Sequence, residues 1–447
     1  MANIMKRKWE GSTCLAVLQG LTSLNISDSD IQDLTSLNIS GNILGPEGAH
    51  ALSALKNLTS LNLSNNNIWL EGARALPVLQ NLTSLDISHN NIGSGGARAL
   101  SALKSLTSLN IAWNNIGPES AHALSALQNL TSLDIGWNMI GPVGARALST
   151  LQNLTFLNLA WNNIGLEGTQ SLAVLQNLTY LNVSRNNIWA EGAHALSALK
   201  NLKHLDVSQN NLIFADAHYL SALQNLTSLN IRENYLGPRG VRVLSSLVTL
   251  TSLNIGYNGL GAEGAVCLSS LTELVSLVID RNYLGFVSAL AISSLTNIAF
   301  LDISSNNIST FGAHALSALP ALTSLNIRDN TVTYDIDFII RNIPIRVLTF
   351  LDIRGNIFAP AAVHIMAKAY LRQKKKILCD LDLGTMAWKN PWTFWALGEM
   401  DKNIIILLLL AQKFDPGCLF SFLPREIILF ICRWTFRIDL TAAMQKL

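Results

Sequence analysis

The sequence has few charged residues. Asp, Glu, Lys and Arg make up 13% of its 447 residues, about half of the roughly 25% that soluble proteins carry on average. Lys and Arg number 31 and Asp and Glu 29, so the net charge is +2. This balance argues against a protein that binds nucleic acid through its charge. Most of the surface polarity must come from uncharged groups.

Long apolar runs are also absent, although 49% of the residues are hydrophobic. A fraction this high excludes a disordered chain. The longest unbroken apolar run covers only residues 404–411, whereas a helix that spans a bilayer needs about 20 residues. No convincing cleavage site follows the basic residues 6–8. We therefore expect a cytoplasmic protein without a membrane span.

Clustered cysteines and catalytic motifs are missing as well. The five cysteines are odd in number and scattered, which favours a reducing compartment over a disulfide framework or a zinc site. No phosphate-binding glycine loop, His-Glu-x-x-His or Gly-x-Ser-x-Gly motif is present. We predict no catalytic residue, metal or cofactor. A cysteine enzyme built around Cys418 is the remaining enzymatic alternative, and residues 385–447 are few for such a site.

What the sequence does have is a repeat. The phrase Leu-x-x-Leu-x-Ile/Leu-x-x-Asn returns every 24 residues, with a last step of 26, and fourteen copies keep the Asn, from Asn42 to Asn356. A truncated copy begins at Leu21 and a degenerate copy at Leu378. The complete copies open at Leu34, Leu58, Leu82, Leu106, Leu130, Leu154, Leu178, Leu202, Leu226, Leu250, Leu274, Ile298, Leu322 and Leu348. Such self-similarity predicts a solenoid rather than separate globular domains.

Each copy predicts one strand, one turn and one helical stretch. The alternating pattern predicts a short strand whose Leu61 and Leu63 point inward and whose Asn62 points outward. Asn66 is expected to turn inward and bind backbone groups of the turn. Residues 192–199 predict a helix with one apolar face. One unit cannot bury its apolar surface alone, so the units must stack.

These residues and their spacing resemble the leucine-rich repeat family, and the Gly-Ala-His-Ala-Leu of residues 48–52 resembles its GALA-type subclass. The resemblance implies an α/β fold, a horseshoe solenoid with an inner parallel sheet and outer helices. We predict an N-terminal cap over residues 1–20, the solenoid over residues 21–384 and a small helical C-terminal domain over residues 385–447 that caps it. For function the resemblance implies protein–protein recognition.

Histidine and acidic residues recur at fixed positions of the repeat, which argues against catalysis. Six of the eight histidines lie sixteen residues after the opening Leu, on the expected exposed face of the helix. Metal binding and acid–base chemistry need convergent side chains instead. The Asp and Asn residues four positions after the opening Leu form a second row. We interpret that row as a polar ladder along the sheet rather than as paired carboxylates.

Aromatic residues break this regularity at two positions of the repeat. They are Trp113, Trp137 and Trp161 seven positions after the opening Leu, and Phe156, Tyr180 and His204 two positions after it, with Arg185 nearby. Exposed aromatics beside an arginine match the composition of an interface hot spot, so we predict that these residues bind a protein on the concave face. The alternative is an intramolecular stacking ladder. Stacking would explain the Trp column but not the aromatics of the strands.

A second set of charged and aromatic residues is a weaker candidate for polar specificity. Its members are Arg232, Glu233, Tyr257, Asp280, Arg281, Arg328 and Arg354. The alternative is an ordinary solvated surface.

Residues 422–440 carry a different pattern. The segment resembles the opening of an F-box, which in its family docks on the Skp-type adaptor of cullin–RING ubiquitin ligases. The residues that carry the resemblance are Leu423, Pro424, Glu426, Ile427 and Ile431. Pro424 suits a first helical turn, and Glu426 suits the positive end of a helix. The segment is shorter than an F-box and lies at the opposite end from its usual place, so the alternative is that its apolar residues belong to the core of the cap.

These features together predict a non-catalytic recognition protein. GALA-type repeats joined to an F-box-like segment resemble secreted virulence effectors of host-associated bacteria. This resemblance implies action in the host cell cytoplasm, with a protein target on the concave face and a Skp-type adaptor as a second partner. The alternative is a scaffold or adhesion protein without a link to ubiquitin, whose C-terminal helices only cap the solenoid.

Overall fold

The computed structural model describes residues 16–17, 34–332, 348–356 and 378–379. The chain divides into two compact units, residues 1–282 and 283–447, and this border lies inside the predicted repeat array. The predicted domain borders after residues 20 and 384 lie outside the described residues. The predicted helical C-terminal domain also lies outside them.

Unit 1 contains a parallel sheet to which each repeat adds one short strand. The strands lie side by side in chain order, and their register places equivalent repeat positions next to each other, for example Leu61 beside Leu85. The strands are β1 (Ala16–Val17), β2 (Ser36–Asn38), β3 (Ser60–Asn62), β4 (Ser84–Asp86), β5 (Ser108–Asn110), β6 (Ser132–Asp134), β7 (Phe156–Asn158), β8 (Tyr180–Asn182), β9 (His204–Asp206), β10 (Ser228–Asn230), β11 (Ser252–Asn254) and β12 (Ser276–Val278).

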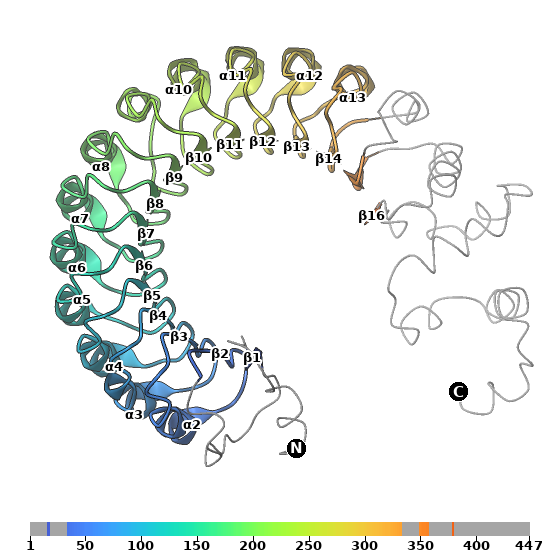
Figure 1. Ribbon diagram of the computed structural model, residues 1–447. Coiled ribbons are helices and arrows are strands. Elements are labelled where there is room, and N and C mark those ends of the chain that lie inside the picture. Colours follow the sequence, from blue (N-terminus) through green and yellow to red (C-terminus); the bar gives the residue numbers. More distant parts are fainter. Residues whose placement is uncertain (1–15, 18–33, 333–347, 357–377, 380–447) are drawn as a thin grey trace, which may run out of the picture. The chain divides into compact units, whose positions relative to one another are not determined.

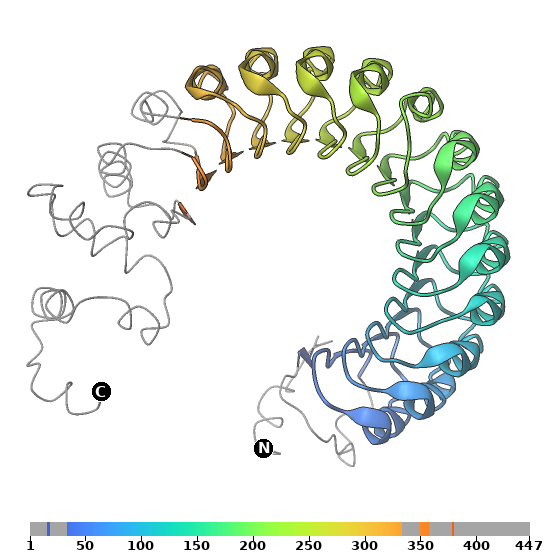
Figure 2. The ribbon, with the colours of Figure 1, turned by 180° about the vertical axis from the view of Figure 1, so that it is seen from behind.

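Helices alternate with these strands. Figures 1 and 2 show that, within unit 1, the strands line the inner side of an arc and the helices its outer side. The helices are α2 (Gly45–Leu52), α3 (Trp69–Ala73), the 3-10 helix η2 (Leu76–Val78), α4 (Gly93–Leu100), α5 (Pro118–Leu124), α6 (Gly141–Leu148), α7 (Gly165–Leu172), α8 (Trp189–Leu196), α9 (Ala217–Leu220), α10 (Gly237–Leu244) and α11 (Gly261–Leu268). The predicted solenoid with an inner parallel sheet and outer helices is confirmed.

The core runs between sheet and helices as a stack of equivalent apolar positions. Leu61 and Leu63 are buried, whereas Asn62 is partly exposed, as the alternation predicts. Strand β3 ends at Asn62, so Leu63 reaches the core from just beyond the strand. Because every repeat buries the same positions, the core continues from one repeat to the next instead of closing within a repeat.

The buried Asn of each repeat joins neighbouring repeats through hydrogen bonds. Asn90 donates from Nδ2 to the backbone oxygens of Ile87 in its own repeat (3.1 Å) and Leu63 in the preceding one (2.8 Å). Its Oδ1 accepts from the backbone N–H groups of Asn66 (2.9 Å) and Ile68 (3.1 Å). All fourteen of these Asn residues are buried. The predicted role of this Asn is confirmed, since it satisfies turn groups that water does not reach.

The outer helices pack on each other closely through small residues. A Cβ atom on Gly144 of α6 would lie 3.1 Å from Cβ of Ala121 in α5 and 2.6 Å from Cβ of Ile140. Glycine at this position therefore sets the spacing between helices.

The predicted bounds of the helix over residues 192–199 were wrong. Helix α8 spans Trp189–Leu196. It ends there because the backbone N–H and Oγ of Ser197 both donate to the oxygen of His194, and the chain then turns. Leu199 is buried in that turn rather than on the helix.

Unit 2 repeats the same plan. It contains α12 (Gly285–Ile292), β13 (Phe300–Asp302), α13 (Thr310–Leu316), β14 (Ser324–Asn326), β15 (Phe350–Asp352) and β16 (Leu378–Cys379). Strands β13 to β16 pair in parallel in chain order. Leu325 pairs with Leu351, as predicted from the openings at Leu322 and Leu348.

At both ends of the array the predicted strand position was wrong. The strand beside β2 is Ala16–Val17, which precedes the copy that opens at Leu21. That copy, residues 21–33, lies outside the described residues. At the other end Cys379, not Leu381, pairs with Leu351. The predicted position of this last strand is wrong by two residues. A shift by two leaves the alternation of inward and outward side chains unchanged, and that alternation was the basis of the prediction.

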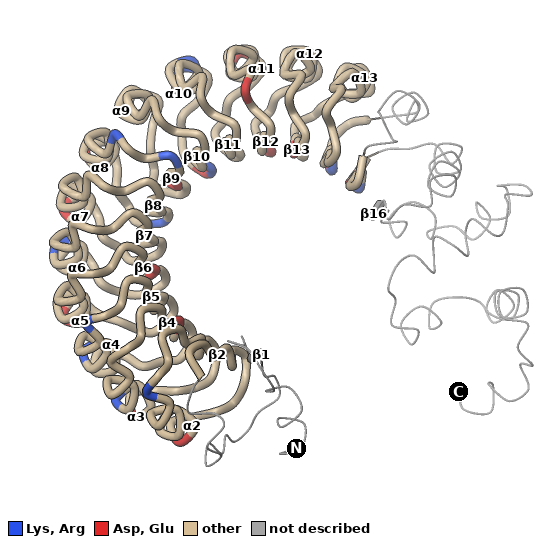
Figure 3. The backbone as a smooth tube through the Cα atoms, viewed as in Figure 1, with Lys and Arg blue, Asp and Glu red and all other residues tan. Residues whose placement is uncertain are grey.

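Charged side chains are few and scattered. Figure 3 shows the tube of the described residues mostly uncharged, with isolated acidic and basic positions on helices and strands. Among the described residues, no helix combines the length and apolar character that crossing a bilayer requires.

Candidate functional site

The turn after each strand holds up to three residues in the left-handed backbone conformation, and every complete repeat has one of them seven positions after its opening residue. Glycine and Asn fill this position in some copies: Gly41 has φ 70° and Asn65 φ 56°. Trp113, Trp137 and Trp161 occupy the same position with φ between 55° and 58°. An L-residue other than Gly, Asn or Asp rarely adopts this conformation, at a cost of roughly 1–2 kcal/mol. The repeat therefore carries three indoles where smaller residues cost less.

The three indoles form a continuous stack, which is the arrangement that the intramolecular alternative predicts. The ring centroids of Trp113 and Trp137 are 4.0 Å apart and those of Trp137 and Trp161 are 4.1 Å apart, with interplanar angles of 14° and 20°. His89 extends the stack at one end, at 5.0 Å, and the Arg185 guanidinium covers Trp161 at the other, at 3.9 Å. The indoles nevertheless stay exposed, Trp113 to 43%, Trp137 to 38% and Trp161 to 36%. We call the row from His89 to Arg185 the Trp column.

The aromatic residues on the strands also stack. Phe156 and Tyr180 lie 4.3 Å apart at 12°, and His204 lies 6.2 Å from Tyr180 at 38°. The expectation that stacking leaves the strand aromatics unexplained was therefore wrong. Parallel pairing at one register brings equivalent side chains of neighbouring strands together. Burial raises the pKa of the Tyr180 hydroxyl, and the charge of Asp206 adds to the increase.

The two aromatic rows are separate features of the concave side. Phe156 begins strand β7, whereas Trp161 lies beyond its end. A partly exposed Asn158 lies between these positions in the chain. The structure thus aligns the residues of each predicted row, and Phe156, Tyr180 and His204 take no part in the pocket that Trp161 and Arg185 line.

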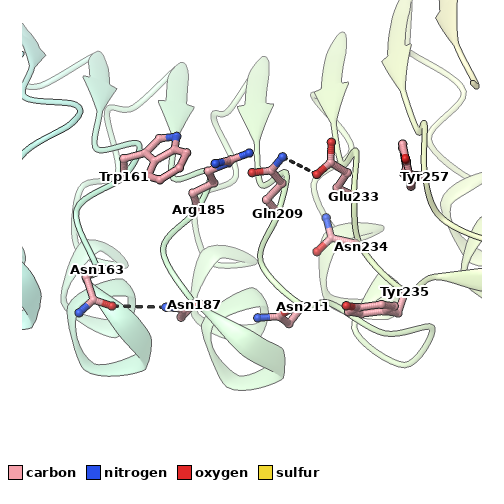
Figure 4. A pocket seen from close by; sticks show the side chains of 10 residues that line it. All are labelled: Trp161, Asn163, Arg185, Asn187, Gln209, Asn211, Glu233, Asn234, Tyr235 and Tyr257. Atoms are coloured by element: carbon pink, nitrogen blue, oxygen red, sulfur yellow. Dashed lines mark hydrogen bonds between the residues drawn. The ribbon is translucent and has the colours of Figure 1, made fainter.

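That pocket lies at the end of the Trp column. It has a volume of about 660 Å³. Figure 4 shows its side chains in two rows, with Trp161, Arg185, Gln209, Glu233 and Tyr257 nearer the strands. The second row follows the turn and contains Asn163, Asn187, Asn211 and Tyr235; Asn234 completes the lining.

The weaker second patch is a network of paired charges. Arg232 pairs with Asp280 through both terminal nitrogens and donates from Nε to Glu233 (3.2 Å). The hydrogen bond with Asp280 raises the pKa of the Arg232 guanidinium. Arg281 donates to the hydroxyl of Tyr257 and lies over its ring, 4.9 Å from the centroid. These five residues come together as one cluster in unit 1.

The other two members of the predicted second patch belong to unit 2. Arg328 pairs with Asp329 (3.0 Å) and Arg354 with Asp352 (2.6 Å). Each of these arginines is thus engaged by a carboxylate of its own repeat.

The polar ladder behaves as a hydrogen-bonded row, as we interpreted it. Asn158 donates to Asp134 Oδ2 (3.1 Å), and the backbone N–H of Gly136 donates to Asp134 Oδ1 (3.0 Å). Burial raises the pKa of Asp134, and the charge of Asp86 contributes to the same effect. Among the described residues, no group of three or more His, Cys, Asp or Glu side chains is arranged to hold a metal ion.

Sequence reasoning missed an exposed apolar cluster around α9. Ile213 is 44% exposed and Phe214 47% exposed, and Ile213 forms a β-bridge with Tyr235, which is 68% exposed. Tyr219 on α9 contacts His194 at 4.8 Å between ring centroids. The signal was the repeat that opens at Leu202, which lacks the glycines found at the helix start in most copies. Helix α9 accordingly spans only four residues.

Two sets of predicted residues lie outside the described residues. One is the F-box-like set of Leu423, Pro424, Glu426, Ile427 and Ile431, and the other is the alternative around Cys418.

Comparisons with known proteins agree with this architecture. A family model described as "Leucine-rich repeat region" matches residues 52–271 and 146–369, and a model described as "Leucine Rich repeat" matches residues 32–53. No curated protein sequence matches significantly.

Solved structures with a similar fold come from bacteria and mammals. The Leptospira interrogans LRR protein LIC12759 aligns with a TM-score of 0.55 and 20% identity over 85% of this chain and 98% of its own. The mouse RP105/MD-1 complex aligns with a TM-score of 0.51 and 18% identity, over 83% of this chain and 75% of the matched one. The internalin inlF of Listeria monocytogenes aligns with a TM-score of 0.50 and 23% identity, over 78% of this chain and 86% of its own. At these identities the similarity concerns the fold alone. The two matches to one family model together cover more than half of the sequence, so the chain belongs to the leucine-rich repeat family.

Proposed function

We propose that this chain is a non-catalytic recognition module that binds a protein on the concave side of unit 1. The observation that carries the proposal is the Trp column, where three stacked indoles remain more than a third exposed on the concave side. Exposed apolar rings gathered on one surface are typical of an interaction site. Trp, Tyr and Arg are also the residues that dominate binding energy at protein interfaces.

The stacking of the column supports this role as well. A stacked indole has lost most of its rotational freedom before a partner arrives, so binding costs less side-chain entropy. The neighbouring row of Phe156 and Tyr180 is ordered in the same way. A shared fold with one chain of the RP105/MD-1 complex is consistent with a protein ligand and is an analogy of fold only.

Site-specific photo-crosslinking tests the recognition surface. Benzoylphenylalanine placed at Tyr180 is expected to crosslink a protein from eukaryotic lysate, because this residue lies on the concave side. The matched control places the same group at Tyr219, a tyrosine on helix α9 that is 37% exposed. Equal crosslinking at both positions, or none at Tyr180, would contradict the proposal.

A second test removes part of the Trp column. Trp137→Asn is expected to abolish capture of the crosslinked protein. The control Trp69→Asn removes an indole of the same backbone conformation, φ 53°, and 48% exposure from the start of α3, and is expected to leave capture unchanged.

We infer further that the chain is a GALA-type bacterial effector that acts in the host cytoplasm and links its target to a cullin–RING ubiquitin ligase. The support is the resemblance of the repeats to the GALA subclass and of residues 422–440 to an F-box. The expected partner is a Skp-type adaptor. Purified intact chain should capture such an adaptor, and the double variant Pro424→Ala and Ile427→Ala should abolish capture. Ile405→Ala, outside the pattern, is the control. Failure of the intact chain to bind the adaptor would contradict the proposed ubiquitin link.

The alternative is a scaffold or adhesion protein without a ubiquitin link. It predicts that concave variants change binding whereas C-terminal variants change only stability. Capture of the same target by residues 1–384 and by the intact chain, with adaptor bound to neither, would favour this alternative.

A further inference from the structure

Two of the three aromatic rings that line the pocket at the end of the Trp column are already covered. One face of Trp161 lies against Trp137 and the other against the Arg185 guanidinium, at 4.1 and 3.9 Å. The ring of Tyr257 lies beneath Arg232 and Arg281, at 5.4 and 4.9 Å. A ligand that stacks on an aromatic ring therefore finds the rings of Trp161 and Tyr257 occupied, whereas Tyr235 is 68% exposed.

The pocket instead presents hydrogen-bond donors. Tyr257 accepts from Arg281, so its own O–H is left to donate. Asn187 donates to Asn163 Oδ1 at 3.4 Å, which leaves the Nδ2 group of Asn163 as a donor. Figure 4 shows Arg185 between Trp161 and Gln209 in the row nearer the strands, with its guanidinium near the strand ends.

Arg185 is the charged group of the pocket that lacks a carboxylate partner. Its contact among the described residues is the stack on Trp161. Stacking holds the guanidinium plane and leaves its in-plane N–H donors available for a fork-shaped contact.

The one acidic group in the lining is already engaged. Glu233 accepts from Gln209 Nε2 through Oε2 (2.5 Å) and from Arg232 Nε through Oε1 (3.2 Å). Arg232 also pairs with Asp280, so Glu233 shares this guanidinium with a second carboxylate. Among the described residues, Arg185 is the cation of the lining that no carboxylate engages.

We propose that this pocket binds the carboxylate of an acidic side chain presented by the protein partner. The inference rests on the proposed recognition function and names the chemistry of one contact in it. A single forked guanidinium with neutral donors around it matches a monoanionic carboxylate. The Trp column beside the pocket then covers the apolar surface that flanks the acidic residue.

The test uses a small carboxylate probe and the indole of Trp161 as reporter. The chain is labelled with ¹⁵N-indole tryptophan, and the Trp161 N–H signal is assigned with Trp161→Phe. Acetyl-glutamate-methylamide is titrated at constant ionic strength and is expected to shift this signal saturably. Its neutral isostere acetyl-glutamine-methylamide is expected to leave the signal in place, since it lacks the charge that the fork recognises.

Variants distinguish the forked hydrogen bonds of the Arg185 guanidinium from attraction by its positive charge alone. Arg185→Gln is expected to weaken binding of the probe at least tenfold, and Arg185→Lys, which keeps the charge without the fork, less so. The control Arg146→Gln removes an exposed arginine from α6 that pairs with Glu167 and should leave the titration unchanged. The other indole signals report whether each variant keeps its fold.

Three outcomes would overturn the proposal. They are an equal shift with the glutamine analogue, a titration of Arg185→Gln within twofold of the native chain, and saturation by inorganic phosphate at lower concentration than by the carboxylate. The titration needs no protein partner, so its failure would remove the carboxylate contact alone. Failure of crosslinking at Tyr180 would remove the recognition function instead.

Discussion

Replacing members of the Trp column one at a time is expected to give unequal losses of stability. Trp113 and Trp137 have nearly the same φ, 58° and 55°, and similar exposure, 43% and 38%. Asn in place of either residue therefore gains about the same relief of backbone strain and loses about the same buried area. The difference between the two variants isolates the stacking partners.

The magnitude follows from the neighbours of each ring. Trp137 loses two indole contacts, at 4.0 and 4.1 Å, whereas Trp113 loses one indole contact and a looser one with His89 at 5.0 Å. An aromatic pair contributes about 0.5–1.5 kcal/mol beyond burial, and the relief of the left-handed backbone returns about 1 kcal/mol. These two terms give a cost of about 1 kcal/mol for Trp137→Asn, to which the lost burial adds, and a cost about 0.5–1 kcal/mol larger than for Trp113→Asn.

Urea denaturation followed by circular dichroism measures both variants. The control is Asn65→Trp, which adds an indole to the same column at φ 56° beside His89. This variant incurs the strain of the left-handed backbone and gains only one loose contact, with His89. Its free energy of unfolding should therefore be unchanged or lower. The reasoning would be refuted by a larger loss in Trp113→Asn than in Trp137→Asn, or by a stabilising Asn65→Trp.

Three further substitutions test the repeat itself. Asn138→Ala leaves the buried N–H groups of Asn114 and Ile116 without an acceptor and should cost about 2–5 kcal/mol in urea denaturation. Gly144→Val places side-chain atoms against the preceding helix and should cost about 1–3 kcal/mol in the same assay. Burial raises the pKa of Asp134, so its charged form destabilises the fold; Asp134→Asn should raise the melting temperature at pH 7, and the gain should vanish at acidic pH, below both the folded and unfolded pKa values.

The interior of the fold was predictable because every repeat buries the same positions. Alternation around Leu61 indicated which residues face the core, and Asn66 had few ways to satisfy a buried amide other than by binding the turn. Fourteen copies at nearly constant spacing left little freedom in register. At Leu378 the repeat spacing is irregular, and the strand lies two residues from its predicted position. A shift by two residues leaves the same side chains facing the core, so the apolar pattern does not reveal it.

The candidate site was predictable in its residues but not in its contacts. The sequence placed Trp113, Trp137 and Trp161 at one position, and parallel register made their stacking foreseeable. That Arg185 ends the stack while Arg232 is shared by Glu233 and Asp280 depends on side-chain conformations that repeat position alone does not determine. The left-handed backbone of the column was foreseeable from Gly41 and Asn65, residues that commonly adopt it.

Curvature explains why ring stacks form on the concave side of unit 1. Neighbouring strands lie about 4.8 Å apart, yet the rings of Trp113, Trp137 and Trp161 lie 4.0–4.1 Å apart. Side chains that project from the inner side of an arc (Figure 1) converge and approach the contact distance of stacked rings, whereas the outer helices diverge. The same convergence leaves no room between the indoles for a ligand ring. A partner must therefore contact the exposed edges of the Trp column and the donors at its end, which is where Arg185 lies.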